Sequence, residues 1–465
     1  MSFATIHASA PHPRTIAIVG GGFSGSTVAA NLLLYPPSVP TRIVLIERLP
    51  DIARGVAYAQ RAFPYLLNVP AAQMSADPQQ PAGFLQFAQR RRPTVTAEDF
   101  LPREWYGDYL NERLSHGVQT APAHVSFIRV TGEAQDLTKT ASGEWRIELD
   151  NGDTVAANAV VLACGNPRPR ALPSADGLED LIVDPWRDDA RLESCTNILL
   201  VGTGLTMVDV ALRTASLPGP KPHLFALSTH GLLPLPQTNF CRAAAAEHTG
   251  FLEMPDPSIS QMCRASRRAA AGVTKKGRDW REIITSLRLA IPAIWQRASL
   301  EERRRFTRHL RSYWEIHRHR LPPEVATRIQ GLIDDAALEI HAGRVVRLER
   351  EGEQVRVFWR PRGQGAVQSL LVDRVVNCTG PNFNLQRTAD AFLRKLASQQ
   401  LISGDALCLG LRTDLRGQVL DANGVPQSDL WYVGPMLRAD HWEATAVPEL
   451  RVHAMQLSER LAVQA

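Results

Sequence analysis

The chain has 465 residues, too many for one ordinary hydrophobic core, so we expect two or three domains. Hydrophobic residues make up 44% of the chain, charged residues make up 21%, and the formal net charge is +5, which is typical of a soluble globular protein. No apolar run approaches the roughly 18 residues that span a bilayer. We therefore expect no membrane span. The aromatic residues are not interleaved with basic patches, so we also expect no nucleic-acid partner.

Residues 1–13 lack the apolar core of a secretory signal and are predicted to form a flexible tail. The six cysteines form no CxxC pair and no cluster with the spacing of zinc ligands. We therefore expect no metal site and no reactive dithiol, and we interpret Cys164 and Cys378 as packing residues at the ends of apolar strands. These features favour a cytoplasmic protein with reduced thiols.

The first glycine motif is IAIVGGGFSG, in which Gly20, Gly22 and Gly25 have GxGxxG spacing. We predict a strand over 15–20, a helix over 24–34 and a second buried strand over 41–47, which form a βαβ unit. Such glycines permit the tight turn, the approach of a pyrophosphate and close helix packing, and an acid at the end of the next strand suits a ribose hydroxyl. The predicted dinucleotide site comprises Gly20, Gly22, Phe23, Ser24, Gly25, Glu47 and Arg48.

The second motif, ILLVGTGLTMVD, has Met207 where a third glycine could stand, so its helix and strand must pack further apart. We predict a strand over 197–201, a helix over 205–215 and a strand over 223–227. The last strand leads into Ser228-Thr229-His230, with neither the acid that favours NADH nor the arginine that favours NADPH, so the coenzyme preference stays open; His230 or a nearby arginine is a candidate for a phosphate contact. This second site comprises Gly202, Gly204, Leu205, Thr206 and Ser228.

Residues 126–165 and 344–380 repeat one pattern: short alternating strands, a polar turn, and an apolar strand that ends in LACGNP or NCTGPN. Each repeat predicts a small antiparallel meander that returns the chain to a parallel sheet. The fold class is therefore α/β with two Rossmann-like dinucleotide-binding domains. We expect a discontinuous first domain over 14–187 and 340–465, and a second domain over 188–339 with a helical insertion at about 255–335.

The insertion contains HLRSYWEIHRHR, whose histidines raise the question of a metal. On a helix His317 and His319 point about 200° apart, so they do not share an ion. His309 and Tyr313 share a face with His317. One interpretation is an amphipathic polar helix, and another is a substrate-facing wall; Trp280 and Trp314 fit both.

The chain resembles the two-dinucleotide-binding flavoproteins, with a glutathione-reductase-like architecture, that include the flavin-dependent N-hydroxylating and Baeyer–Villiger monooxygenases. More closely it resembles bacterial FAD/NAD(P)-binding proteins. The resemblance covers nearly the whole chain and rests on GGGFSG, GVAYAQ, LLNVPAAQMSADP, FLPREWYGDYL, DPW, GTGLTMVD, DWR, RFTRHLRSYWEIHRHR and TAVPELR.

The resemblance implies that the first motif holds FAD and the second holds NAD(P)H. It also implies further cofactor contacts along the flavin ring, at the adenine side, at the strand ends and at the pyrimidine end; these are Tyr58, Asn68, Val69, Val130, Gly165, Gly380, Gly434, Ala446 and Val447. The chain departs from the sequences of these families in two respects. Ser228-Thr229-His230-Gly231 replaces the Ser-Arg-Arg-Gly of related proteins, and the FxGxxxHxxx(W/P) signature of Baeyer–Villiger enzymes is absent.

The leading hypothesis is an FAD-dependent, NAD(P)H-consuming monooxygenase that uses molecular oxygen through a C4a-(hydro)peroxyflavin and acts on a small molecule such as an amine or amino acid. Arginines of the insertion could clamp a substrate carboxylate. No catalytic acid or base is identified. One alternative is an FAD-dependent dehydrogenase or reductase that passes electrons to another acceptor. Another is a non-catalytic flavin-binding sensor or assembly protein. Substrate and oligomeric state stay open.

Overall fold

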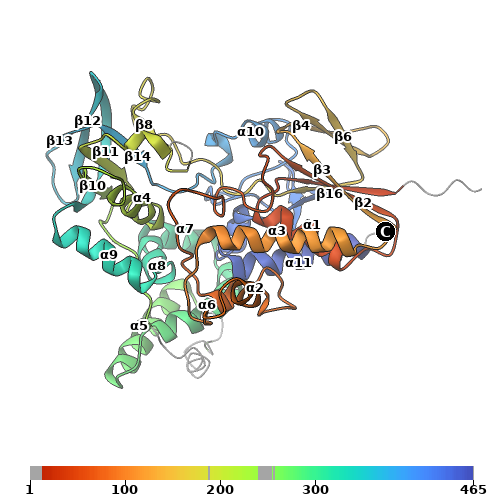
Figure 1. Cartoon of the computed structure of the whole chain (residues 1–465), viewed down its shortest axis with the longest axis horizontal. Coiled ribbons are helices and arrows are strands. Elements are labelled where there is room, and N and C mark those ends of the chain that lie inside the picture. Colours follow the sequence, from red (N-terminus) through yellow and green to blue (C-terminus); the bar gives the residue numbers. More distant parts are fainter. Residues whose placement is uncertain (1–12, 187–188, 239–253, 255–256, 464–465) are drawn as a thin grey trace, which may run out of the picture.

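The computed structural model describes residues 13–186, 189–238, 254 and 257–463, so the predicted tail at 1–13 lies almost wholly outside it. Two β-sheets occupy opposite sides of the molecule, and a group of helices lies below the space between them in Figure 1. Within the described residues, no helix has the length and hydrophobicity needed to cross a bilayer.

The first sheet contains the predicted βαβ unit. Its two strands pair in parallel, with Ile16 opposite Ile43, and their apolar side chains are buried because both faces of the sheet are covered. The strand order is β15-β16-β7-β1-β2-β3, so a C-terminal strand lies beside β7 in the same sheet. The elements are β1 (Arg14–Val19), α1 (Phe23–Leu34), β2 (Thr41–Glu47), β3 (Val125–Thr131), β7 (Ala159–Leu162), β15 (Gln418–Leu420) and β16 (Pro426–Tyr432).

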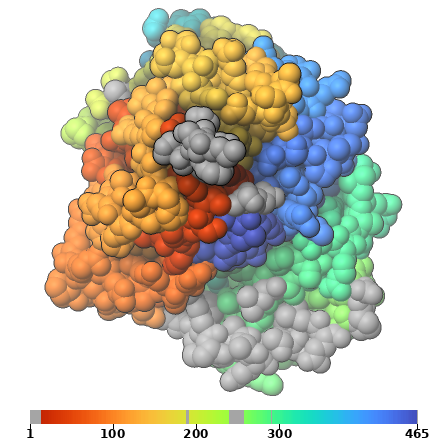
Figure 2. Space-filling view, turned by 90° about the vertical axis from the view of Figure 1, so that its right-hand side faces the viewer, coloured from red at the N-terminus to blue at the C-terminus, as the bar shows by residue number. Residues whose placement is uncertain are grey.

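Helices cover one face of this sheet and a meander covers the other. Leu114 and Leu457, from two different helices, pack with α1 against the first face, while Trp145 and Phe392 pack on the second. Figure 2 shows the N-terminal part of the chain, in red to yellow, meeting the C-terminal part, in blue. The covering elements are α3 (Arg103–Thr120), α11 (Val447–Val463), β4 (Ala134–Lys139), β5 (Trp145–Leu149), β6 (Thr154–Ala157) and α10 (Ala391–Ser398); η1 (Ala71–Gln73), α2 (Gly83–Arg91) and η5 (Leu385–Arg387) lie in the connections.

The second sheet contains the second predicted unit and has the order β13-β12-β11-β10-β9-β14-β8. β9 lies centrally, paired in parallel with both β10 and β14. Helices α4 and α9 pack together on one face, where Met207 and Ile329 are buried. The elements are β8 (Ile182–Val183), η2 (Asp189–Leu192), β9 (Asn197–Val201), α4 (Leu205–Ala215), β10 (His223–Ser228), α9 (Pro323–Asp334), β11 (Leu338–Glu351), β12 (Gln354–Pro361), β13 (Gln368–Val372) and β14 (Arg374–Asn377).

The strand order corrects the predicted domain limits. The expected return to the first domain near residue 340 is wrong, because β11 to β14 all belong to the second sheet. β11 pairs in parallel with β10 and then in antiparallel fashion with β12, so one long strand joins the sheet to its meander. The two repeats therefore serve one domain each. We propose domain limits close to Ile182 and Asn377, which are the first and last residues of the second sheet in sequence order.

The helical insertion is shorter than predicted. α9 leads into β11 and packs on α4, so it is the crossover helix of the second unit, and the insertion ends before it. Two helices of the insertion begin with capping boxes, Ser258 with Gln261 and Ser299 with Glu302. The insertion contains α5 (Ile259–Lys275), α6 (Arg281–Arg297), α7 (Leu300–His309) and α8 (Arg311–Arg318).

Charged and aromatic side chains fasten the insertion to η6 (Pro435–Ala439) and the segment that follows it. Glu315 of α8 forms an ion pair with Arg438. Trp295 Nε1 donates to the carbonyl oxygen of Ala439 at 2.9 Å, and Trp314 Nε1 donates to Glu443 Oε1 at 3.0 Å. Burial alone would raise the pKa of Glu315, but Arg438, His319 and Arg311 together hold that pKa well below its ordinary value. The insertion is thus attached to the first domain by paired charges.

Substitution of Glu315 by Gln tests this attachment. We expect Glu315→Gln to lower the free energy of unfolding by about 1–2 kcal/mol, because Arg438 loses a charged partner at a partly exposed site. A depressed folded pKa stabilises the protein above the unfolded value of 4.5, so the difference from wild type should be full at pH 7 and shrink as the pH falls below about 4.5. Thermal denaturation across pH measures it. Glu459→Gln, on the exposed face of α11, is the control, and an equal loss in both variants contradicts the assignment.

Candidate functional site

The first glycine turn is built by direct backbone contacts. Gly20 has φ +106°, and a Cβ there would overlap the carbonyl oxygen of Ala163; a Cβ on Gly25 would overlap the carbonyl oxygen of Gly20. At Gly22, which caps α1, the nearest atom to such a Cβ is 3.6 Å away, the Cα of Gly55. The outer glycines are therefore required by packing, whereas the middle one makes only ordinary contact at a helix N-terminus, where a pyrophosphate fits.

Glu47 is held at the end of β2 by backbone donors. Its Oε2 accepts from the N–H of Gly21 at 2.7 Å, and its Oε1 accepts from the N–H of Leu49 at 2.9 Å. Each oxygen keeps a further lone pair, so the carboxylate can also accept a hydrogen bond from a ribose hydroxyl. The turn and the acid therefore both fit the ribose and pyrophosphate of a dinucleotide.

Two cavities of about 280 Å³ each lie next to one another here, and the first of them begins at this turn. They share Ala57, Tyr58, Thr445 and Val447, so they are neighbours along one elongated cleft. Nine predicted residues line the first cavity: Gly20, Gly22, Phe23, Ser24, Glu47, Arg48, Tyr58, Gly165 and Val447. Six line the second: Tyr58, Asn68, Val69, Leu205, Ala446 and Val447. The cleft thus joins the first glycine turn to the start of α4.

The other predicted residues lie outside the lining of both cavities. Gly25 acts through packing. Val130 packs against the core beside the first sheet, and Gly132, Glu133 and Ala134 line the cavity in its place. Gly434 has φ +144° and lies against Tyr432, next to the lining residue Pro435. The remaining ones belong to the second turn or its strand ends: Gly202, Gly204, Thr206, Ser228 and Gly380.

Cys164 and Cys378 differ in their surroundings. Cys378 is buried in the core of the second domain, as predicted, but Cys164 lines the first cavity and is only half-buried. Burial raises the pKa of both thiols, which keeps them protonated at neutral pH.

The second glycine turn repeats the first. Gly202 has φ +111°, and a Cβ there would overlap the carbonyl oxygen of Cys378, just as Gly20 contacts Ala163. Gly204 caps α4 and has no atom within 4 Å of the position of a Cβ. Met207, which stands in place of the third glycine, is fully buried. The N-terminus of α4 is therefore open in the same way as that of α1.

An ion pair joins the two domains beside the cleft. Arg103 of α3 contacts Asp209 of α4 at 2.8 Å, and its Nε donates to the carbonyl oxygen of Leu66 at 3.0 Å. Burial raises the pKa of Asp209, while Arg103 opposes that rise. Because Arg103 also lines the second cavity, it fixes the start of α4 relative to that cavity.

Three arginines from the insertion and the segment after it line the second cavity: Arg288, Arg318 and Arg320. Arg288 Nε donates to Glu449 Oε1 at 2.6 Å, and Arg318 Nε donates to Glu443 Oε2 at 2.7 Å. No carboxylate is among the described residues that line this cavity. The glutamates therefore hold the guanidinium groups from behind, and the cavity presents positive charge.

The histidines of HLRSYWEIHRHR separate as their spacing predicted. His319 lines the second cavity, whereas His317 lines a different cavity inside the insertion. The nucleotide-site residues that sequence reasoning missed lie mainly in connections. They include Arg54, Arg103, Gln237, Asp390 and Phe392. Arg103 lies in FLPREWYGDYL, one of the segments that carry the family resemblance, but the sequence predicted no role for it.

Beyond the second turn, His230 lies close to Arg362. Burial lowers the pKa of His230, and the charge of Arg362 lowers it further. Arg362 follows β12, and its backbone N–H donates to the carbonyl oxygen of Ala342 in β11, the strand that pairs with β10. A segment distant in sequence therefore supplies the arginine that is absent after β10. A basic group therefore stands where an adenosine 2′-phosphate can be recognised in such folds.

The comparisons agree with this architecture. Residues 17–167 match the family model described as FAD-NAD(P)-binding. No curated protein matches the chain. Ornithine hydroxylase from Pseudomonas aeruginosa, in its reduced form, has a TM-score of 0.64 at 13% identity over 97% of this chain and 99% of that one. L-lysine 6-monooxygenase from Pseudomonas syringae has a TM-score of 0.65 at 16% identity over 97% and 100%.

The cadaverine monooxygenase of desferrioxamine biosynthesis from Erwinia amylovora, bound to FAD, has a TM-score of 0.61 at 12% identity over 97% of this chain and 94% of that one. The bacillithiol disulfide reductase of Staphylococcus aureus has a TM-score of 0.55 at 12% identity over 97% and 98%. Likeness at such identities concerns the fold. The chain has the fold of the FAD-dependent, NAD(P)H-using oxidoreductases with two dinucleotide-binding domains, and its residues 17–167 are an FAD/NAD(P)-binding domain.

Proposed function

We propose that the protein is an FAD-dependent, NAD(P)H-consuming monooxygenase that acts on a small amine or amino acid carrying a carboxylate. The observation that carries this proposal is the second cavity, which lies between the two glycine turns and is lined by Arg288, Arg318 and Arg320. The solved structures of similar fold include enzymes named for ornithine and lysine, which are amino acids, and for cadaverine, which is a diamine.

The first cavity would hold FAD. Gly22 and the N-terminus of α1 would receive the pyrophosphate, and Glu47 would accept a ribose hydroxyl. Tyr58 and Val447 line both cavities, so they would lie where the flavin ring passes from one to the other. Bound FAD would supply hydride acceptance from NAD(P)H and, once reduced, the activation of oxygen.

The second turn would hold the nicotinamide coenzyme, with its pyrophosphate at Gly204 and Leu205. Arg103 and Asp209 would keep this helix start at a constant distance from the cavity. The apolar side chains of Leu67, Met74 and Ile284 line the same cavity and would exclude water from the reacting atoms.

The arginines would orient the substrate. A guanidinium group binds a carboxylate through two parallel hydrogen bonds, which fixes both position and orientation. Glu443 and Glu449 already hold Arg318 and Arg288 in place, so little side-chain freedom would be lost on binding. The substrate amine would then point away from the arginines, towards the part of the cavity that Tyr58 and Asn68 line.

The test of the function is an isotope experiment on the purified protein. We expect a yellow protein whose flavin absorbance is bleached by NADH or NADPH without oxygen. With ¹⁸O₂ and a panel of L-ornithine, L-lysine and cadaverine, the product should contain one labelled oxygen, and the two carboxylate-bearing compounds should react faster than cadaverine. Bleaching without label in any product favours a dehydrogenase or reductase. A flavin that neither coenzyme bleaches favours a sensor or assembly protein.

Replacing Arg288 tests the substrate contact. We expect Arg288→Gln to raise KM for the carboxylate-bearing substrate found above by about 10- to 100-fold, since a charged hydrogen bond is lost. The rate of anaerobic bleaching without substrate should change by less than about threefold, because Arg288 is not part of either glycine turn. Stopped-flow and steady-state measurements separate the two quantities. Arg304→Gln, on the exposed face of α7, is the matched control. A KM that stays within about twofold would disprove the contact.

The position of Arg362 beside His230 leads us to propose a preference for NADPH. Arg362→Gln should raise KM for NADPH by about 5- to 20-fold through loss of a phosphate contact, and should leave KM for NADH within about twofold. Initial rates of flavin bleaching with each coenzyme measure this preference. Arg146→Gln, in the meander of the first domain, removes an exposed charge elsewhere as a control. Equal effects on both coenzymes would assign Arg362 a structural role instead.

A further inference from the structure

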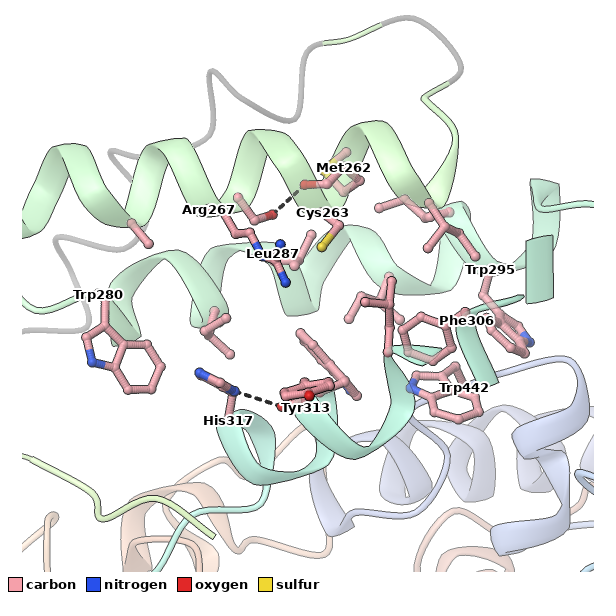
Figure 3. Close-up of a pocket in the computed structure, with 18 residues that line it drawn as sticks. Met262, Cys263, Arg267, Trp280, Leu287, Trp295, Phe306, Tyr313, His317 and Trp442 are labelled. Atoms are coloured by element: carbon pink, nitrogen blue, oxygen red, sulfur yellow. Dashed lines mark hydrogen bonds between the residues drawn. The ribbon is translucent and has the colours of Figure 1, made fainter. Parts of the chain in front are cut away.

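The helical insertion contains a cavity of its own, of about 400 Å³. Helices α5 and α6 form one side, α7 and α8 form the other, and Trp442 of the first domain closes one end (Figure 3). The lining is almost entirely apolar and rich in aromatic rings, among them Trp295, Phe306 and Tyr313. Its volume lies in the range of about 300–1,000 Å³ that is typical of small-molecule sites.

Helix α6 separates this apolar cavity from the cavity assigned to flavin and substrate. Leu287 and Ile291 line the apolar cavity, whereas Thr285 and Arg288 line the second cavity. Ile284 alone among the described residues of α6 lines both. The two cavities therefore lie on different faces of one helix, and they differ in character, since arginines line one and aromatic rings line the other.

The few polar groups in the apolar cavity favour an anion. Arg267 lines it, and Figure 3 shows that this side chain reaches from α5 towards α6. Arg267 forms no ion pair with any described residue, and none of the described lining residues is a carboxylate. His317 Nδ1 lies 2.7 Å from the carbonyl oxygen of Tyr313, an acceptor, so this nitrogen donates within the protein and Arg267 is the group that supplies positive charge to the cavity.

We propose that this cavity binds an apolar organic acid with a ring system, whose ring packs among the aromatic side chains and whose carboxylate pairs with Arg267. Rings packed edge to face add to the free energy of burial. Phe306 already packs in that way against Trp295 and Trp442, with ring centroids 5.8 and 5.0 Å apart. The guanidinium group supplies the charge that a neutral apolar site would lack. The site is separate from the proposed monooxygenase reaction and does not depend on it.

The test uses isothermal titration calorimetry of the purified full-length protein with 3-indolepropionate and with its uncharged amide. We expect one saturable site for the acid, and at least about fivefold weaker binding of the amide. Arg267→Gln should weaken the acid by about fivefold or more and leave the amide unchanged. Arg268→Gln, the adjacent exposed charge that does not line the cavity, should leave both unchanged. Equal affinity of acid and amide, or no effect of Arg267→Gln, would overturn the proposal.

Two further variants locate the site. Cys263→Phe places a ring inside the cavity and should abolish binding of both compounds, with the thermal midpoint confirming a folded protein. Arg288→Gln alters a residue of the second cavity, which does not line the apolar cavity, and should leave binding of the acid intact. Binding that survives Cys263→Phe, or that is lost in Arg288→Gln, places the acid elsewhere. If neither compound binds and Cys263→Phe converts an oligomer to a monomer by size-exclusion chromatography, the apolar face is an interface between copies and the proposal fails.

Discussion

At corresponding positions in the two domains, backbone packs directly on backbone with no room for a side chain. Gly20 lies against the carbonyl of Ala163, and Gly202 lies against the carbonyl of Cys378. Both contacts join the end of a strand to the strand that follows the meander of the same domain. Because the glycine fixes the turn, it also fixes where the next helix begins. The two open helix N-termini, and hence the cleft between them, depend on these contacts.

The helical insertion is positioned by charge rather than by continuity of the chain. It is inserted in the second domain, yet its ion pairs run to the first, from Glu315 to Arg438, from Arg318 to Glu443 and from Arg288 to Glu449. Buried charges without partners are costly. The C-terminal segment supplies the carboxylates for Arg288 and Arg318, and the insertion supplies Glu315 for Arg438 of that segment. A separate pair, Arg103 with Asp209, links the domains themselves.

The parts of the fold that sequence could predict are those with local causes. β2, β9 and α4 begin and end at the predicted residues, and β1 and α1 within one, since each is an apolar run or helix bounded by glycine or a turn. The repeated meanders were visible as patterns, but similarity between two segments does not say which sheet each one joins. The second meander was therefore assigned to the wrong domain, and only the pairing of β14 with β9 decides it.

In the candidate site too, the sequence could predict the residues whose role has a local cause, but not those that tertiary packing brings together. Glycines and an acid at the end of a strand carry their chemistry in their spacing, so the sequence predicted the glycine turn and the acid that line the first cavity, but not most of the cavity's other residues. Arg288 and Arg318 lie on different helices, and Arg362 reaches His230 from another strand, so their roles arise from tertiary packing that no local pattern contains. Because α6 and α8 are fastened to the first domain, Arg288 and Arg318 are held relative to that domain although their helices are inserted in the second. The Arg103–Asp209 pair links α4 to the first domain as well. Under the proposed function, the arginines that would orient the substrate and the helix that would bind the coenzyme are therefore both positioned by contacts with the first domain.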